Sequence, residues 1–263
     1  MNIGIITGSG FYDFEEISGK KDLIIETAEG AVSLAQSQFN RHNFFFIARH
    51  GKSHEFLPNM INYKANILAL MQSGVNLIIA TSVMGIINSS IPLGSLCFFK
   101  DLYFPDNRLP DGTMCTLYGT PGEKQRGHYI FGSPFSKSGN ALALRAAADI
   151  GIPVIQGLVH AHSGGPRFNS RSEIAAFKKA RCDTVSQTVG PEIVLAGEAE
   201  IGYVLLGFGI DYANGVKKKP TPVETLNKNM SASKKIFSRL IMKMIELCDD
   251  QKFFDDGFVY RFI

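Results

Sequence analysis

The chain has 263 residues, of which 45% are hydrophobic and 19% are charged, and its formal net charge is +3. This composition is typical of a folded globular protein with a large core, and it excludes a disordered or fibrous chain. The small net charge and the lack of an arginine-rich stretch predict that nucleic acid is not a partner.

The cysteines indicate a reducing compartment. Cys97, Cys115, Cys182 and Cys248 are far apart and show no metal-binding spacing, so we expect free thiols and no metal. The apolar run at the N-terminus is too short for a signal peptide, and no stretch approaches the roughly 18 apolar residues of a membrane span. We therefore expect a cytoplasmic protein without a membrane partner.

Short apolar runs alternate with segments of helical spacing, which is typical of an α/β protein. The predicted strands cover residues 3–6, 44–48, 77–81, 96–99, 154–159 and 203–208. The predicted helices cover residues 61–71, 141–150, 173–181 and 191–200. A last helix carries one apolar face, formed by Phe237, Leu240, Ile241, Met244, Ile245 and Cys248. Because no linker or repeat interrupts this pattern, we expect residues 1–263 to form a single domain.

The most informative motif is Arg49-His50-Gly51, which follows the predicted strand 44–48 and has His54 close behind it. It would present a guanidinium fork and imidazole donors to an anion at the carboxyl edge of the sheet. The alternative is an arginine that pairs with a surface carboxylate. The anion interpretation is favoured by a second candidate cradle, Gly8-Ser9-Gly10, which follows the first strand.

The glycines of this first loop could also open a dinucleotide-binding fold. That fold requires a third glycine three residues later and a helix directly behind it, whereas Asp13 stands there and residues 11–16 show no helical face. Backbone N–H groups at Gly8 and the hydroxyl of Ser9 suit a small anion instead. A plain tight turn is the alternative explanation.

Two further strand ends carry polar groups. Ser82, within Thr81-Ser82-Val83-Met84, could reach the same anion or could simply cap its strand. Asp211 follows the apolar run that begins at residue 203, so a buried strand would deliver its carboxylate to the edge where open α/β sheets bind ligands. A capping role is the alternative for Asp211.

The turn Gly165-Pro166-Arg167 is followed by an aromatic residue, Phe168. Phe168 could stack on a flat ligand or could anchor the core. Arg167 could bind a ligand or could form a structural ion pair.

Taken together, these motifs resemble the trimeric purine nucleoside phosphorylases, and among them the 5′-methylthioadenosine phosphorylases. The resemblance covers roughly residues 1–240 and rests on Arg49-His50-Gly51 with His54, residues 61–67, Gly165-Pro166-Arg167-Phe168, Pro191-Glu192 and Asp211-Tyr212. It implies a mixed, distorted central sheet flanked by helices, a homotrimer, and no cofactor other than phosphate as a co-substrate.

The resemblance also assigns roles to residues. It places phosphate at Ser9, Arg49, His50, Ser82 and Thr188, the purine at Phe168 and Asp211, and the sugar at Gln187, with Val83 and Met84 also binding substrate. His128 matches a residue that closes the pocket of a neighbouring subunit. The chain departs from the family at Ser9, Gly164 and Gln187, where threonine, glutamate and methionine are expected. It departs from the methylthioadenosine branch at Ile210 and Ala213, where that branch has threonine and aspartate.

The implied reaction is phosphorolysis of a purine nucleoside. Arg49 and His50 would hold the phosphate nucleophile, and Asp211 would donate a proton to N7 of the departing purine. 5′-Methylthioadenosine is the expected substrate, with Pro222, Val223 and Leu226 as an apolar wall against its methylthio group. The alternatives are a phosphorylase of 6-oxopurine nucleosides (inosine, guanosine or 5′-methylthioinosine), a nucleosidase that uses water, and a catalytically impaired paralogue that acts as a binding protein.

Overall fold

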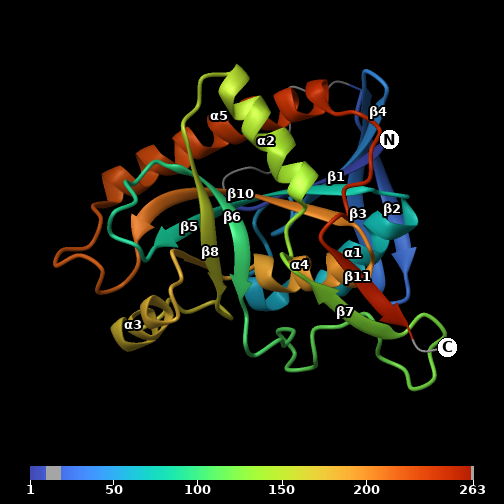
Figure 1. The fold of residues 1–263 in the computed structure, drawn as a ribbon, viewed down its shortest axis with the longest axis horizontal. Helices are drawn as coiled ribbons and strands as arrows, with labels where there is room; N and C mark the ends of the chain where they lie inside the picture. The colour runs from blue at the N-terminus through green and yellow to red at the C-terminus, as the bar shows by residue number, and fades with distance from the viewer. Residues whose placement is uncertain (10–18, 262–263) are drawn as a thin grey trace.

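A mixed sheet forms the framework of the computed structural model, which describes residues 1–9 and 19–261 (Figure 1). The loop residues Gly10 and Asp13 lie outside this part. In the described part the strands of the sheet follow the order β10-β6-β8-β9-β5-β1-β4-β3-β2. Their bounds are β1 (Asn2–Thr7), β2 (Lys21–Thr27), β3 (Gly30–Phe39), β4 (His42–Ala48), β5 (Leu77–Ile86), β6 (Leu96–Tyr103), β8 (Val154–His162), β9 (Thr184–Ser186) and β10 (Gly202–Tyr212).

The sheet is distorted because β10 pairs with two strands. It runs parallel to β5 along most of its length and antiparallel to β6 at Gly207 and Phe208. Strands β5, β9, β8, β6 and β10 therefore close into a ring, while β1, β4, β3 and β2 extend from β5 as an open sheet. This arrangement confirms the predicted mixed, distorted sheet.

Helices cover both faces of the sheet (Figure 1). Helices α2 (Lys137–Asp149) and α5 (Val223–Leu247) bury Leu142 and the predicted face around Leu240 in one apolar cluster. Helices α1 (Tyr63–Gln72) and α4 (Val189–Glu198) contribute Ile67 and Ile193 to the cluster on the other face. Helix α3 (Arg171–Lys179) adds Ile174 to a smaller cluster, and a short 3₁₀ helix covers Pro58–Met60. None of the helices in the described ranges is long and apolar enough to cross a membrane.

The predicted helices and the six predicted strands are all present, but the sequence pattern missed five of the strands in residues 1–9 and 19–261. Strands β2 and β3 form an antiparallel hairpin whose first member is mostly exposed. Strand β9 has only three residues. Strands β7 (Gly127–Phe131) and β11 (Gly257–Arg261) form a separate two-stranded sheet that leaves most of its side chains exposed. Each of these strands buries too few side chains to produce a continuous apolar run.

Strands β1, β4, β5 and β10 run parallel to one another, so their carboxyl ends lie at one edge of the sheet. This edge receives Ser9 after β1, Arg49 after β4 and Asp211 at the end of β10. Residues more than 200 positions apart in sequence, such as Ser9 and Asp211, thereby come to lie in one place.

Candidate active site

A cavity of about 520 Å³ opens at this edge of the sheet. It is lined by all but one of the residues that the family resemblance assigned to ligands, namely Ser9, Arg49, His50, Ser82, Val83, Met84, Phe168, Gln187, Thr188 and Asp211. The exception is His128, which lies on β7 and does not line the cavity. One chain therefore brings the predicted phosphate, sugar and base residues together.

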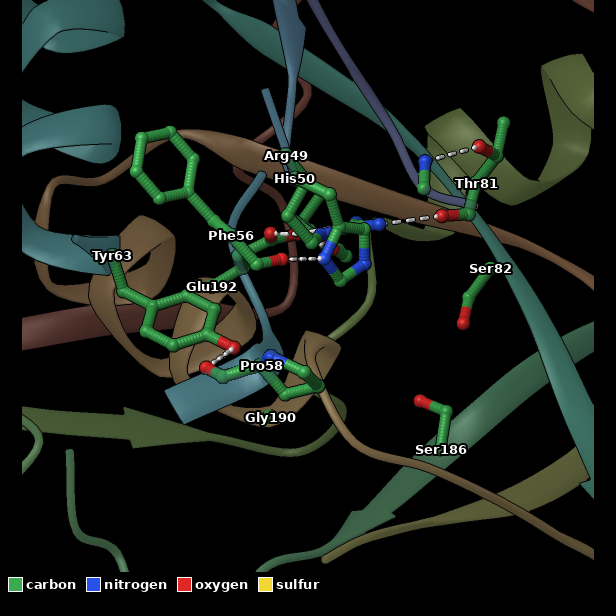
Figure 2. Close-up of polar contacts among 12 residues, drawn as sticks. Arg49, His50, Phe56, Pro58, Tyr63, Thr81, Ser82, Ser186, Gly190 and Glu192 are labelled. Atoms are coloured by element: carbon green, nitrogen blue, oxygen red, sulfur yellow. Dashed lines mark hydrogen bonds and ion pairs between the residues drawn. The ribbon is translucent and has the colours of Figure 1, made fainter. Parts of the chain in front are cut away.

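A buried ion pair lies at one end of the cavity (Figure 2). The Nε of Arg49 donates to Oε1 of Glu192 at 2.5 Å, and its Nη2 donates to Oε2 at 2.9 Å. The third contact of the guanidinium joins Nη1 to the backbone oxygen of Thr81 at 3.0 Å. The two charged side chains are only 1% and 0% exposed. Burial lowers the pKa of Arg49, but the charge of Glu192 outweighs burial and raises it, so the guanidinium stays charged.

This geometry adds a partner that the sequence did not indicate for Arg49. The guanidinium binds a carboxylate, and that carboxylate is buried rather than on the surface. Three of the five guanidinium N–H groups are used by Glu192 and Thr81, which leaves two for a ligand. Gly8 lies directly against them, because a Cβ atom at Gly8 would lie 2.7 Å from Nη1 of Arg49. Only glycine permits this close approach.

Glu192 has a second donor in the core, and neither of these two residues lines the cavity. The hydroxyl of Tyr203 donates to Oε2 of Glu192 at 2.8 Å. Burial and the charge of Glu192 raise the pKa of Tyr203 well above its usual value, so the phenol keeps its proton. The carboxylate is therefore fully satisfied by Arg49 and Tyr203, as a buried charge requires.

The neighbouring histidine, His50, is neutral, and its two ring nitrogens have different roles. Nδ1 of His50 lies 2.7 Å from the backbone oxygen of Phe56, so Nδ1 carries the proton that it donates (Figure 2). Burial lowers the pKa of His50 to about 4, with smaller effects of Arg49 and of the His54 ring stacked 4.6 Å away. At neutral pH, Nε2 of His50 therefore carries a lone pair.

Because Glu192 neutralises the charge of Arg49, the positive potential in this part of the cavity comes from hydroxyl groups and from the N-terminus of a helix. Thr188 lines the cavity as the N-cap of α4, yet its side chain makes no capping hydrogen bond. The dipole of α4 adds positive potential beside this hydroxyl. The N–H groups of its first turn contribute little, because Gly190 donates to Nδ1 of His162 at 3.3 Å and Pro191 has no N–H. Ser9, just after β1, and Ser82 of β5 also line the cavity, and the hydroxyl of Ser82 donates to the backbone oxygen of Val83 at 3.1 Å.

At the other end, Asp211 lies among side chains without charge. Burial raises the pKa of Asp211 to about 6. Ala213 and Ile210, the two departures from the methylthioadenosine branch, line the cavity beside it. Asn169 and Asn214 also line this end, and Nδ2 of Asn214 donates to the backbone oxygen of Asn169 at 2.7 Å.

The loop of Gly165 to Phe168 closes this end. Phe168 is 80% exposed, so it is not a core anchor and its ring is accessible to a ligand. Arg167 forms an exposed ion pair with Glu173 at 2.7 Å, which confirms the structural alternative for that arginine. Gln187 holds the loop, because its Nε2 donates to the backbone oxygen of Arg167 at 2.8 Å.

The predicted apolar wall is wrong in part. Leu226 lines the cavity, but Pro222 does not, and Val223 is 70% exposed and points elsewhere. Asn227 and Met230 of α5 complete this wall instead. The spacing of four residues from Leu226 to Met230 places both side chains on one face of α5, and the predicted wall did not use this signal.

We expect removal of one partner of the ion pair to cost more stability than removal of both. Arg49→Met leaves the carboxylate of Glu192 buried without its counter-ion, and such changes typically cost about 3–5 kcal/mol of the free energy of unfolding. The double variant Arg49→Met with Glu192→Met should recover most of this loss in urea unfolding. Lys52→Met, which breaks the exposed pair with Asp22, is the control and should have far less effect. Equal losses in the single and double variants would contradict this account.

Comparisons with known proteins agree with the sheet and the cavity. Residues 2–246 match the family model described as the phosphorylase superfamily. The chain is 32% identical to the 6-oxopurine nucleoside phosphorylase of Pyrococcus furiosus, over 95% of this chain and 94% of that protein. It is 31% identical to the probable S-methyl-5′-thioinosine phosphorylase of Methanopyrus kandleri, over 93% and 91%.

A third relative is the S-methyl-5′-thioadenosine phosphorylase of Drosophila melanogaster, which is 32% identical over 81% of this chain and 73% of that protein. The fold is also that of the methylthioadenosine phosphorylase of Schistosoma mansoni, whose structure in complex with adenine has a TM-score of 0.81 at 23% identity, covering 94% and 91% of the two chains. With its mixed sheet, its cavity and these matches, the chain belongs to the phosphorylase superfamily, among the purine nucleoside and methylthioadenosine phosphorylases.

Proposed function

We propose that the chain catalyses phosphorolysis of a purine nucleoside, with 5′-methylthioadenosine as the first candidate. The products are the free purine and the 1-phosphate of the sugar. The observation that carries this proposal is the cavity itself, which gathers the residues assigned to phosphate, sugar and base from the strand ends, the loop before α3 and the segment between β9 and α4. Its volume of about 520 Å³ suits a ligand of nucleoside size.

Phosphate would bind at the end where Thr188, Ser9 and Ser82 meet the N-terminus of α4. The two remaining N–H groups of Arg49 donate to it as well. Because Glu192 neutralises the charge of Arg49 and His50 is neutral, hydroxyls and backbone dipoles do most of the binding. Nε2 of His50 accepts a hydrogen bond from the protonated oxygen of hydrogen phosphate.

Asp211 would act on the base. As the bond between C1′ and N9 breaks, the sugar becomes positively charged and the purine becomes negatively charged. A phosphate oxygen forms the new bond to C1′ and stabilises the cationic sugar. Protonated Asp211 gives its proton to N7, so the purine leaves neutral.

A second candidate is phosphorolysis of a 6-oxopurine nucleoside. Ala213 leaves Asp211 as the single carboxylate that lines the cavity among the described residues, and Asn169 and Asn214 offer amides beside it. Amides can both donate to and accept from a 6-oxopurine edge. Relatives named for 6-oxopurine and methylthioinosine substrates support this candidate.

The 5′ end of the sugar would lie against α5. Leu226 and Met230 favour an apolar methylthio group, whereas the amide of Asn227 could bond a hydroxyl. We infer that the two apolar side chains decide, which places 5′-methylthio substrates first.

We further propose that residues 1–263 work as one domain in the cytoplasm, with phosphate as co-substrate and no other cofactor. The two large apolar clusters cover opposite faces of the same sheet, which supports a single domain. All four cysteines are free and buried, as in a reducing compartment.

Base release should depend on phosphate. We expect 5′-methylthioadenosine to be cleaved in phosphate buffer with a higher kcat/KM than adenosine, inosine or 5′-methylthioinosine, because Leu226 and Met230 face the 5′ group. In phosphate-free buffer the release should stop. Equal rates without phosphate would indicate a nucleosidase. Binding without any turnover would indicate a catalytically impaired paralogue.

The pH dependence of kcat/KM should reflect the protonation of Asp211. Since the pKa of Asp211 is about 6 and the protonated form donates, kcat/KM should fall as the pH rises through about 6. Asp211→Asn should abolish this limb and lower the rate by ~10²–10⁴ on 6-aminopurines, with a smaller loss on 6-oxopurines. Asp22→Asn, at an exposed site, is the matched control. An unchanged profile in Asp211→Asn would remove Asp211 from this role.

We also propose a homotrimer. Strands β7 and β11 turn His128, Ile130, Phe258 and Tyr260 outward, and in the pairing Phe258 lies opposite Ile130. Ile130 is 47% exposed and Phe258 is 52% exposed, so they form an apolar face that a subunit interface would cover. His128 on this face is the residue assigned to a neighbour's pocket.

Sedimentation should therefore show a trimer. Ile130→Asp should dissociate it and lower activity together, because a charge placed at a buried interface lacks a partner. Ile24→Asp, which alters a more exposed isoleucine on β2, should leave the assembly intact. A fully active monomer would argue against the assignment of His128.

A further inference from the structure

A serine outside every motif lies in the wall of the cavity. Ser186, the last residue of β9, lines the cavity and is 9% exposed. Its Oγ lies 2.9 Å from Nε2 of His160, which is completely buried. On the other side of the ring, Nδ1 lies 2.8 Å from Oγ1 of Thr184. A hydrogen-bonded chain thus leads from the core to the cavity.

The strand pairing explains this arrangement. Strands β8 and β9 are parallel, with His160 opposite Thr184 and His162 opposite Ser186. Thr184 and Ser186 are two residues apart on a strand, so both side chains lie on the same face and reach the two nitrogens of one ring. The edge of the ring also packs on Phe99, with the ring centroids 5.3 Å apart.

The hydrogen bonds that join Thr184, His160 and Ser186 can hold their protons in two arrangements, so Ser186 can either donate or accept toward the cavity. Burial, with a smaller effect of His162, lowers the pKa of His160 to about 3, so the imidazole is neutral. A neutral imidazole has one N–H and one lone pair. In one tautomer Nε2–H donates to Ser186, whose own O–H then points to the cavity. In the other, Ser186 donates to Nε2 and turns its lone pairs to the cavity.

The position of Ser186 indicates its ligand. It directly precedes Gln187 and Thr188, which are assigned to the sugar and to phosphate, and Figure 2 shows the hydroxyls of Ser82 and Ser186 turned toward the same space. A group that both donates and accepts can use either tautomer of His160. A sugar hydroxyl is such a group.

We propose that Ser186 binds a ribose hydroxyl of the nucleoside and thereby selects ribonucleosides over deoxynucleosides, and that His160 positions it. The proposal rests on the proposed nucleoside site and adds a residue to it. Thr184 acts one step further back by holding the ring of His160.

Deoxynucleosides test the contact. Adenosine and inosine are compared with their 2′-deoxy and 3′-deoxy forms in the wild type and in Ser186→Ala. We expect KM for the ribonucleosides to rise about three- to tenfold, the range for one lost hydrogen bond. The deoxy compound that lacks the bound hydroxyl should not change, and neither should KM for phosphate. Equal losses for all three sugars, or a change confined to phosphate, would overturn the proposal.

Binding measured by calorimetry without phosphate separates this proposal from the reaction. If the wild type binds ribonucleosides more tightly than the deoxy forms and Ser186→Ala does not, the contact holds whether or not phosphorolysis occurs. Ser186→Thr keeps the hydroxyl and should keep the discrimination, which excludes misfolding as the cause. Ser73→Ala removes a hydroxyl that donates to a backbone oxygen away from the cavity and should change neither constant.

The role of His160 is tested through Thr184. Thr184→Val removes the partner of Nδ1 with little change in shape. In an otherwise wild-type chain, we expect this variant to prefer the ribonucleoside over the deoxynucleoside less strongly than the wild type does. In the Ser186→Ala background the same substitution should have no further effect on this preference. A loss of equal size in both backgrounds would show that Thr184 serves the fold alone and would overturn the positioning role.

Discussion

The Arg49–Glu192 pair ties together the elements that form the cavity. Arg49 follows β4, Glu192 lies in α4, and the contacts of the pair extend to Thr81 in β5 and Tyr203 in β10. A buried charge must have its partners in place, so these four elements are constrained relative to one another. The position of the cavity follows from this constraint. Most contacts of the pair are with other parts of the protein, and only the two remaining N–H groups of Arg49 can bind a ligand.

One consequence is an anion end with little net charge. Glu192 cancels Arg49, and His50 is neutral because burial lowers its pKa to about 4. The groups that remain are the hydroxyls of Thr188 and Ser9, the dipole of α4, and the hydroxyl of Ser82, whose proton goes to the backbone oxygen of Val83. Fixed dipoles of this kind need little reorganisation as charge moves from phosphate to sugar and purine.

The sequence predicted the elements that bury continuous apolar runs and missed those that do not. β5 and β10 were visible, whereas β2 and β9 were not, because one is mostly exposed and the other has three residues. The residues around the cavity were predictable because the carboxyl ends of parallel strands meet at one edge and because the motifs resemble a known family.

The roles of individual groups were less predictable, because they depend on distant partners. Glu192 lies 143 positions from Arg49, and nothing near Arg49 in sequence indicates it. The acceptor at Nε2 of His50 follows from a backbone oxygen, that of Phe56, which has no sequence signature. Leu226 lines the cavity and Val223 does not because of the rotation of α5 about its axis. The sequence does not show this rotation, because it depends on how the preceding loop places the helix.

His160, in the core, is a second histidine whose role depends on its hydrogen-bond partners. Both His50 and His160 are neutral rings whose function depends on which nitrogen carries the proton. At His50 a backbone oxygen fixes that choice, since an oxygen can only accept. At His160 both partners are hydroxyls, which can accept or donate, so the choice stays open until a ligand reaches Ser186. A fixed acceptor suits the single proton of hydrogen phosphate, and an adaptable hydroxyl suits a sugar.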